Sequence, residues 1–188
     1  NDDFSDVFIG HNTWVDYYMG NRIIKTYEMN FNDDSKFSKK MTFTSYPGKI
    51  GSTDDYFITS NNLVIQETTN SVLNEEILNK ITPRAYLNWI RTMVANRLST
   101  SSIEWIENFS SHNSGTYNNQ YMILDLKLID FENKIIKDNA FMINEQMPGK
   151  TLSADVTDVL RSKKYWPSFN IPYFPEVRKK FGYDELLE

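Results

Sequence analysis

Apolar and polar residues alternate in several short runs along the first part of the chain, and this two-residue period is typical of half-buried β-strands. The pair Asn61-Asn62 separates two of these runs. Asparagine tolerates the left-handed backbone of a tight turn, so a β-hairpin is expected there. The expected strands cover residues 7–9, 22–31, 41–45, 56–60 and 63–68.

The spacing of apolar residues changes to a helical period in the middle of the chain. Thr82-Pro83 is a helix start signal, with threonine as the N-cap and proline at the first helical position. A second helix is expected to begin at Ser101 or Ser102, and a shorter one covers residues 73–81. In the first of these helices, four apolar residues at helical spacing predict a face that packs on a sheet: Leu87, Ile90, Val94 and Leu98.

Strand patterns return in the last part of the chain, over residues 121–128 and 140–147. Short helices are expected at residues 155–160 and 175–181. The segment 166–172 between them contains two prolines and is expected to be irregular. Strands, then helices, then strands again predict an α+β fold built from packed layers.

Composition limits the class of protein. The 188 residues are 40% hydrophobic and 14% aromatic, which is enough to bury a core within one domain. No apolar run approaches the roughly 18 residues that span a bilayer, and the first residues are polar and acidic, so neither a transmembrane segment nor a secretory signal is expected. A net charge of −5 without a large basic cluster disfavours a nucleic-acid partner.

The residues taken alone carry little catalytic signal. A phosphate-binding loop, a dinucleotide fingerprint and a nucleophile elbow are all missing from the sequence. With no cysteine and two histidines, the chain offers neither a thiol nucleophile nor a zinc ligand set, so no metal or cofactor is expected. A single histidine such as His11 favours a surface or structural role. The pair Asp54-Asp55 could act as two carboxylates, but acids in a turn before a strand favour a structural role.

Several longer stretches resemble the phospholipase B-like family, and they occur in family order over almost the whole chain. They are "GHNTW" (10–14), "STDDYFITSNNLVIQETT" (52–69), "VANRLST" (94–100), "NSGTYNNQYMILD" (113–125), "NEQMPG" (144–149), "SADVTDVL" (153–160) and "YWPSFNIPYFPEV" (165–177). The resemblance implies an N-terminal-nucleophile hydrolase fold, an αββα four-layer sandwich. Residues 1–188 would be a single-domain fragment of that larger architecture.

The resemblance also implies a mechanism. A family precursor cuts itself and exposes an N-terminal cysteine, whose thiol is the nucleophile and whose α-amino group is the base. That cysteine would lie just upstream of Asn1. His11 would lie close to the thiol, Trp14 would wall the pocket, and Thr68 would stand beside the nucleophile. Asn170 would donate a side-chain N–H to the oxyanion.

The implied function is hydrolysis of acyl ester or amide bonds in lipid-like or N-acyl substrates, at a lysosomal or extracellular location. The implied partners are the substrate and the remaining parts of the same precursor. The family's further site arginine has no clear match here, because Arg178 is too near and is interpreted as a helix-surface residue. The alternative is a non-catalytic lipid- or protein-binding module that retains the fold. The residue preceding Asn1 distinguishes the two, since a cysteine there favours the enzyme.

Overall fold

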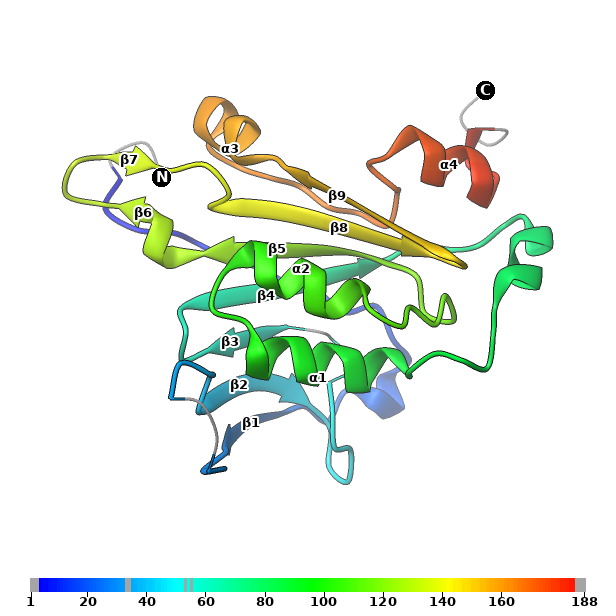
Figure 1. Cartoon of the computed structure of the whole chain (residues 1–188), viewed down its shortest axis with the longest axis horizontal. Coiled ribbons are helices and arrows are strands. Elements are labelled where there is room, and N and C mark those ends of the chain that lie inside the picture. Colours follow the sequence, from blue (N-terminus) through cyan, green and yellow to red (C-terminus); the bar gives the residue numbers. More distant parts are fainter. Residues whose placement is uncertain (1–3, 33–34, 53, 55, 185–188) are drawn as a thin grey trace.

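A computed structural model describes residues 4–32, 35–52, 54 and 56–184. Its centre is a seven-stranded antiparallel sheet in the order β1-β2-β3-β4-β5-β8-β9 (Figure 1). The strands are β1 (Ile23–Glu28), β2 (Lys40–Ser45), β3 (Phe57–Thr59), β4 (Leu63–Thr69), β5 (Asn119–Asp125), β8 (Phe141–Met147) and β9 (Lys150–Asp155).

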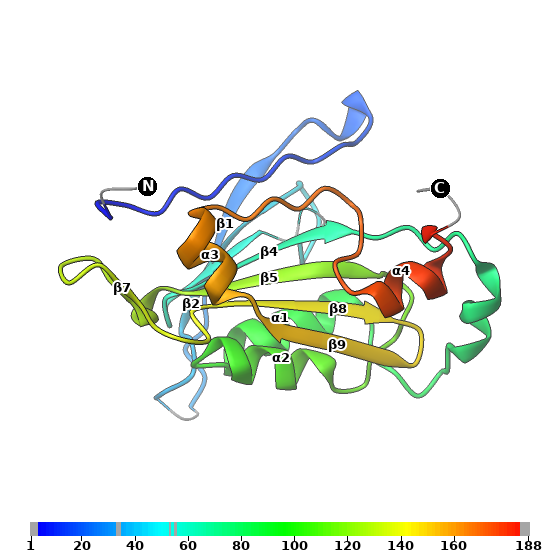
Figure 2. The same ribbon diagram turned by 90° about the horizontal axis from the view of Figure 1, so that it is seen from above.

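Helices lie on both sides of the sheet. The pair α1 (Asn88–Leu98) and α2 (Ser102–Ser110) covers one face, while α3 (Thr157–Lys163) and the irregular N-terminal segment lie over the other (Figure 2). The helix α4 (Pro175–Phe181) lies near the C-terminus. Smaller elements are the 3₁₀-helices η1 (Tyr17–Met19), η2 (Glu75–Lys80) and η3 (Leu126–Leu128), and a hairpin of β6 (Ile129–Asp130) and β7 (Ile135–Ile136).

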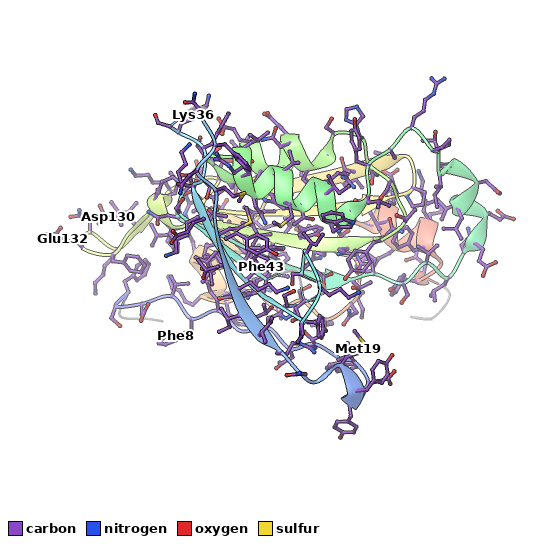
Figure 3. The ribbon with its side chains drawn as sticks, turned by 90° about the horizontal axis from the view of Figure 1, so that it is seen from below. Phe8, Met19, Lys36, Phe43, Asp130 and Glu132 are labelled. Carbon is purple, nitrogen blue, oxygen red and sulfur yellow. The ribbon has the colours of Figure 1, made fainter. Side chains whose placement is uncertain are left out.

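The central strands β4, β5 and β8 are buried on both faces, and successive residues of a strand point to opposite faces. Leu63 and Ile65 of β4 belong to the core under α1 and α2, whereas Val64 belongs to the core on the opposite face. Figure 3 shows Phe43 in the interior of the helix-covered layer, while Phe8 lies at the periphery. The α+β fold class predicted from the sequence is therefore confirmed, and the four-layer sandwich remains a prediction.

Most of the predicted strands are confirmed with shifted ends, and so is the Asn61-Asn62 turn, where Asn62 has a left-handed backbone with φ of 58°. The strand expected over residues 7–9 is wrong, since that segment passes over the sheet without pairing to it. The helix start expected at Thr82 is also wrong. Thr82 instead accepts a hydrogen bond from the Arg84 amide at 3.2 Å, and the helix begins at Asn88.

The face of α1 that packs on the sheet differs from the predicted one. Leu87 is 57% exposed and Val94 is 44% exposed, whereas Arg91 and Asn96 are buried. The cause is a polar lining beneath the helix. Asn96 accepts a hydrogen bond from the Trp105 indole at 2.7 Å, and Arg91 donates to Gln146 of β8 at 2.8 Å. Burial lowers the pKa of Arg91 to about 10.

Candidate active site

The strand β4 has an edge that is only partly paired. Its pairing with β3 covers Val64 and Ile65, whereas its pairing with β5 continues to Thr69. Asn70 donates its amide to Asn118 on the β5 side. The backbone groups of successive strand residues point alternately to the two sides of the strand. Those of Glu67 and Thr69 therefore point away from β5, and their carbonyl groups face the unpaired edge.

His11 forms a hydrogen bond with the Glu67 carbonyl group. Its Nε2 lies 3.1 Å from the Glu67 carbonyl oxygen, although 56 residues separate the two along the chain. The Gln66 side chain adds a 3.5 Å bond to the Gly10 carbonyl. The segment that carries His11 is therefore fastened to β4 by side chains rather than by strand pairing.

The irregular segment 166–174 forms a hydrogen bond with the Thr69 carbonyl group. Asn170 donates its Nδ2 to the Thr69 carbonyl at 2.8 Å, and it adopts a left-handed backbone with φ of 65°. Between these two contacts, the hydroxyl groups of Thr68 and Ser168 form a hydrogen bond with 2.5 Å between the two oxygens. Three of the four predicted site residues thus meet at β4 residues 67–69. Two residues of strand span only about 7 Å.

Buried polar side chains hold the segment 166–174 in place. Glu145 of β8 accepts hydrogen bonds from the amides of Tyr173 and Phe174, at 2.6 and 3.1 Å, and from Gln120 at 2.7 Å. The same Gln120 accepts from the Trp166 indole at 3.3 Å. Burial raises the pKa of the Glu145 carboxyl group above its usual value, because the charged form loses solvation.

The raised pKa of Glu145 makes a stability prediction that depends on pH. Below the unfolded value of 4.5, the group is protonated in both states and its contribution is fully present. As the pH rises through the folded pKa, ionising the buried group costs free energy and part of that contribution is lost. The free-energy advantage of wild type over Glu145→Gln, which loses at least one hydrogen bond, is about 1–3 kcal/mol. We expect it to be smaller at pH 7 than at pH 4 in urea titrations, and an advantage that grows with pH would contradict this assignment.

Two cavities adjoin this region and share Ile9. One has a volume of about 430 Å³ and is mainly apolar, with Val64, Met122 and Trp166 among its lining residues. The other has a volume of about 590 Å³ and contains His11. Trp14 is 93% exposed and lines neither cavity, so it is the one predicted residue that the fold does not bring to β4.

Several residues of this region were not singled out from the sequence as site residues. Thr13 contacts His11 and also Asp54, which is 41 residues away, and Ser168 contacts Thr68, which is 100 residues away. Glu145 holds the segment that carries Asn170 through partners 25–29 residues away, so no local pattern shows these contacts. Asp54 is 3% exposed and forms an ion pair with Arg22 at 3.0 Å. Asp55 lies outside the described residues. Within the described ranges, acids and histidines form no group of three that could hold a metal, and no helix is long and apolar enough to cross a bilayer.

Comparison with known proteins decides the family. The family model described as Phospholipase B matches residues 1–188. The chain belongs to the phospholipase B family. It is 43% identical over 99% of its length to phospholipase B-like protein G of Dictyostelium discoideum, and 39% identical over 98% to human phospholipase B-like 1. Identity to the phospholipase B of Crotalus adamanteus is 38% over 98% of the chain.

The family resemblance read from the sequence is therefore confirmed over the whole chain. The chain spans about a third of the length of these phospholipase B relatives, between 32% and 33%.

Proposed function

We propose that the full-length protein is an acyl hydrolase that cleaves ester or amide bonds of lipid-like substrates through a cysteine lying upstream of Asn1. The observation that carries this proposal is the meeting of His11, Thr68 and Asn170 at residues 67–69 of β4. These residues come from three distant parts of the chain. A polar cluster assembled in this way at an unpaired strand edge is a suitable place for a nucleophile that itself opens a strand.

The proposed reaction is acyl transfer in two steps. The cysteine thiol gives its proton to its own α-amino group, and its sulfur attacks the substrate carbonyl carbon. The resulting oxyanion accepts an N–H of Asn170, which has a second hydrogen besides the one donated to Thr69. The bond to the leaving group breaks and the ammonium group protonates the departing alcohol or amine. Water then hydrolyses the thioester, and its proton returns to the amine.

His11 and Thr68 have supporting roles in this proposal. The His11 ring lies beside the region where the thiol would enter, and its fixed Nε2 contact with the Glu67 carbonyl holds the ring in place. The Thr68 hydroxyl forms a hydrogen bond with the Ser168 hydroxyl and keeps the segment of Asn170 against β4. Trp14 would wall the pocket only once other parts of the precursor cover it, because it is exposed here.

An acyl chain suits the apolar cavity next to this region. Its volume of about 430 Å³ falls within the usual range of about 300–1,000 Å³ for small-molecule sites. Gly10, which precedes His11, contributes to its lining together with Gln66. A carbonyl group presented to His11 and Asn170 could therefore extend its hydrocarbon chain into this cavity. Ester and amide substrates fit this arrangement equally well.

We further propose that the remaining parts of the precursor complete the αββα four-layer sandwich. The relatives are about three times as long as this chain, and large apolar side chains of the N-terminal segment are exposed, including Phe8, Tyr17 and Tyr18. Contacts with other precursor segments would bury them. A lysosomal or extracellular location goes with the family assignment. Asn108-Phe109-Ser110 matches a glycosylation pattern, but the Asn108 amide already donates to Ser99 at 3.0 Å.

The test compares the full-length matured protein with the 188-residue chain alone. We expect the full-length protein to hydrolyse phosphatidylcholine or N-acylethanolamines at acid or neutral pH, and the isolated chain to show no turnover, because it contains no thiol. A cysteine-to-serine variant of the full-length protein is the matched control. Turnover by the isolated chain would contradict the proposed nucleophile. A full-length protein that binds lipid without hydrolysis would favour the non-catalytic binding module.

A further inference from the structure

Asp54 is a buried carboxylate near His11 that the proposed reaction does not use. Its Oδ2 pairs with the Arg22 guanidinium at 3.0 Å, and its Oδ1 accepts from Tyr46 at 3.3 Å. The backbone amide of Asp54 donates a hydrogen bond to the Ser52 hydroxyl at 3.1 Å. Because Arg22 and Tyr46 both donate to it, the carboxylate is fixed in position, and at 3% exposed it is too well buried to act as an ordinary surface charge.

Thr13 connects this carboxylate to the histidine ring. Its Oγ1 lies 2.9 Å from Asp54 Oδ1 and 3.5 Å from His11 Nδ1. On the far side of the ring, Nε2 lies 3.1 Å from the Glu67 carbonyl oxygen. A continuous line of polar contacts therefore runs from Asp54 through Thr13 and His11 to β4.

The direction of each hydrogen bond follows from the atoms at the two ends. The Glu67 carbonyl can only accept, so His11 Nε2 carries a hydrogen. The Asp54 carboxylate also accepts only, so the single hydroxyl hydrogen of Thr13 points toward it. The lone pairs of Thr13 Oγ1 are then left to face His11 Nδ1. This oxygen can accept a hydrogen from Nδ1 when the ring carries two.

We propose that Asp54 and Thr13 are positioning residues that fix the rotation of the His11 ring and give its Nδ1–H an acceptor. The catalytic consequence rests on the proposed function, but the positioning itself does not. The histidine in this arrangement is oriented from both nitrogens, and the more distant carboxylate sets the direction of the hydroxyl group between them. Asp54 is thus assigned a role other than that of a simple turn residue.

Other charged or titratable groups share the surroundings of the ring. Arg22 and Asp16 line the same cavity as His11, and Tyr56 faces the ring with centroids 6.5 Å apart. Arg22 forms an ion pair with Asp54, and within the described part of the chain none of these three groups hydrogen-bonds to a His11 nitrogen. The hydroxyl group of Thr13 is therefore the decisive side-chain contact to test.

The test observes the ring N–H protons of His11 by NMR in acidic solution, at a pH chosen so that both ring nitrogens carry a hydrogen. The 188-residue chain contains one other histidine, the exposed His112, which serves as an internal reference. A ring N–H without an acceptor in the protein exchanges quickly with water and its signal is lost. We expect both His11 N–H signals in wild type and in Thr13→Ser. We expect Thr13→Val to lose the Nδ1–H signal and keep the Nε2–H signal, because the acceptor of Nδ1–H is gone. We expect Asp54→Asn to weaken the Nδ1–H signal and keep the Nε2–H signal, because the Thr13 hydroxyl hydrogen is then no longer held away from the ring by a carboxylate.

The control variant is Tyr46→Phe, which removes another donor from the same Asp54 oxygen without interrupting the line to His11. It should keep both signals. Loss of the Nδ1–H signal in Tyr46→Phe, or its persistence in Thr13→Val, would overturn the proposal. Loss of both N–H signals in Asp54→Asn would show a general loss of structure around His11. The comparison of the Nδ1–H signal between Thr13→Val and Thr13→Ser then decides whether the proposal holds.

The catalytic consequence is measured separately in the full-length protein. We expect Thr13→Val to lower kcat by roughly ten- to a hundredfold, the scale known for removing the hydrogen-bond partner that orients a metal-bound imidazole, and Thr13→Ser to restore it. If the NMR signature changes as expected while kcat does not, the positioning of His11 stands and its role in the proposed reaction fails.

Discussion

Asn170→Gly is expected to lower kcat of the full-length protein by about 10²–10³ while leaving KM nearly unchanged. The reason is that an oxyanion donor strengthens its contact only as the carbonyl becomes tetrahedral, so its loss affects the transition state more than substrate binding. Asn170 already donates one hydrogen to the Thr69 carbonyl at 2.8 Å, and this contact directs the amide toward the edge of β4.

Glycine is the appropriate replacement because of the backbone at this position. Asn170 has φ of 65°, which glycine adopts freely and alanine adopts only with strain. Asn170→Asp is a second variant that keeps the shape and removes the N–H donor. Steady-state kinetics on one acyl substrate, with thermal melts to verify folding, provide the measurement. Full kcat in a folded Asn170→Gly would reassign the segment 166–174 as a structural corner.

Ala95→Asp is expected to unfold the chain, whereas Val94→Asp at the next position is expected to change its free energy of unfolding by less than about 1 kcal/mol. Ala95 is fully buried in the core that α1 shares with α2 and the sheet, whereas Val94 is 44% exposed. Burying one unpaired carboxylate costs several kcal/mol, which approaches the whole stability of a domain. Exposed substitutions seldom exceed about 0.5 kcal/mol.

The pair is matched in position, since both variants place an aspartate in the middle of α1. Alanine is the better helix former, so helix propensity adds at most about 0.7 kcal/mol to the cost of Ala95→Asp, which is far less than the expected difference. Thermal melts and urea titrations of the 188-residue chain give the comparison. An Ala95→Asp variant with an unchanged melt would show that α1 does not pack on the sheet as described. A Val94→Asp variant that unfolds would show that the apolar spacing, rather than the polar lining, defines the buried face.

The strands of this fold could be predicted because their information is local. The apolar and polar pattern of a strand and the residues of a turn are properties of neighbouring positions. Examples are residues 41–45, residues 63–68 and the Asn61-Asn62 turn. The segment 7–9 is also rich in strand-forming residues, but among the described residues it has no strand partner, and pairing is a tertiary property. The orientation of α1 failed for a related reason. Apolar spacing selects a face only if the opposing surface is apolar, and here Gln146 lies beneath Arg91.

The site could be predicted only through the family resemblance. Contacts at β4 join His11 to Glu67, Thr68 to Ser168 and Asn170 to Thr69, over separations of 56 to 101 residues. No periodicity in a single sequence encodes such pairs. The link from Asp54 through Thr13 was missed because a buried acid in a turn has the same sequence pattern as an exposed one. Its burial and partners are visible only once the chain is folded.

The most direct test of the acyl-transfer account is the mass of the covalent intermediate. The full-length matured protein is mixed briefly with an acyl substrate, quenched in acid, and digested for peptide mass spectrometry. The account predicts an acyl group on one N-terminal cysteine upstream of Asn1, formed rapidly in wild type and far more slowly in Asn170→Gly. An acyl group on a serine or threonine of this chain, or turnover without any acylated cysteine at any quench time, would contradict it.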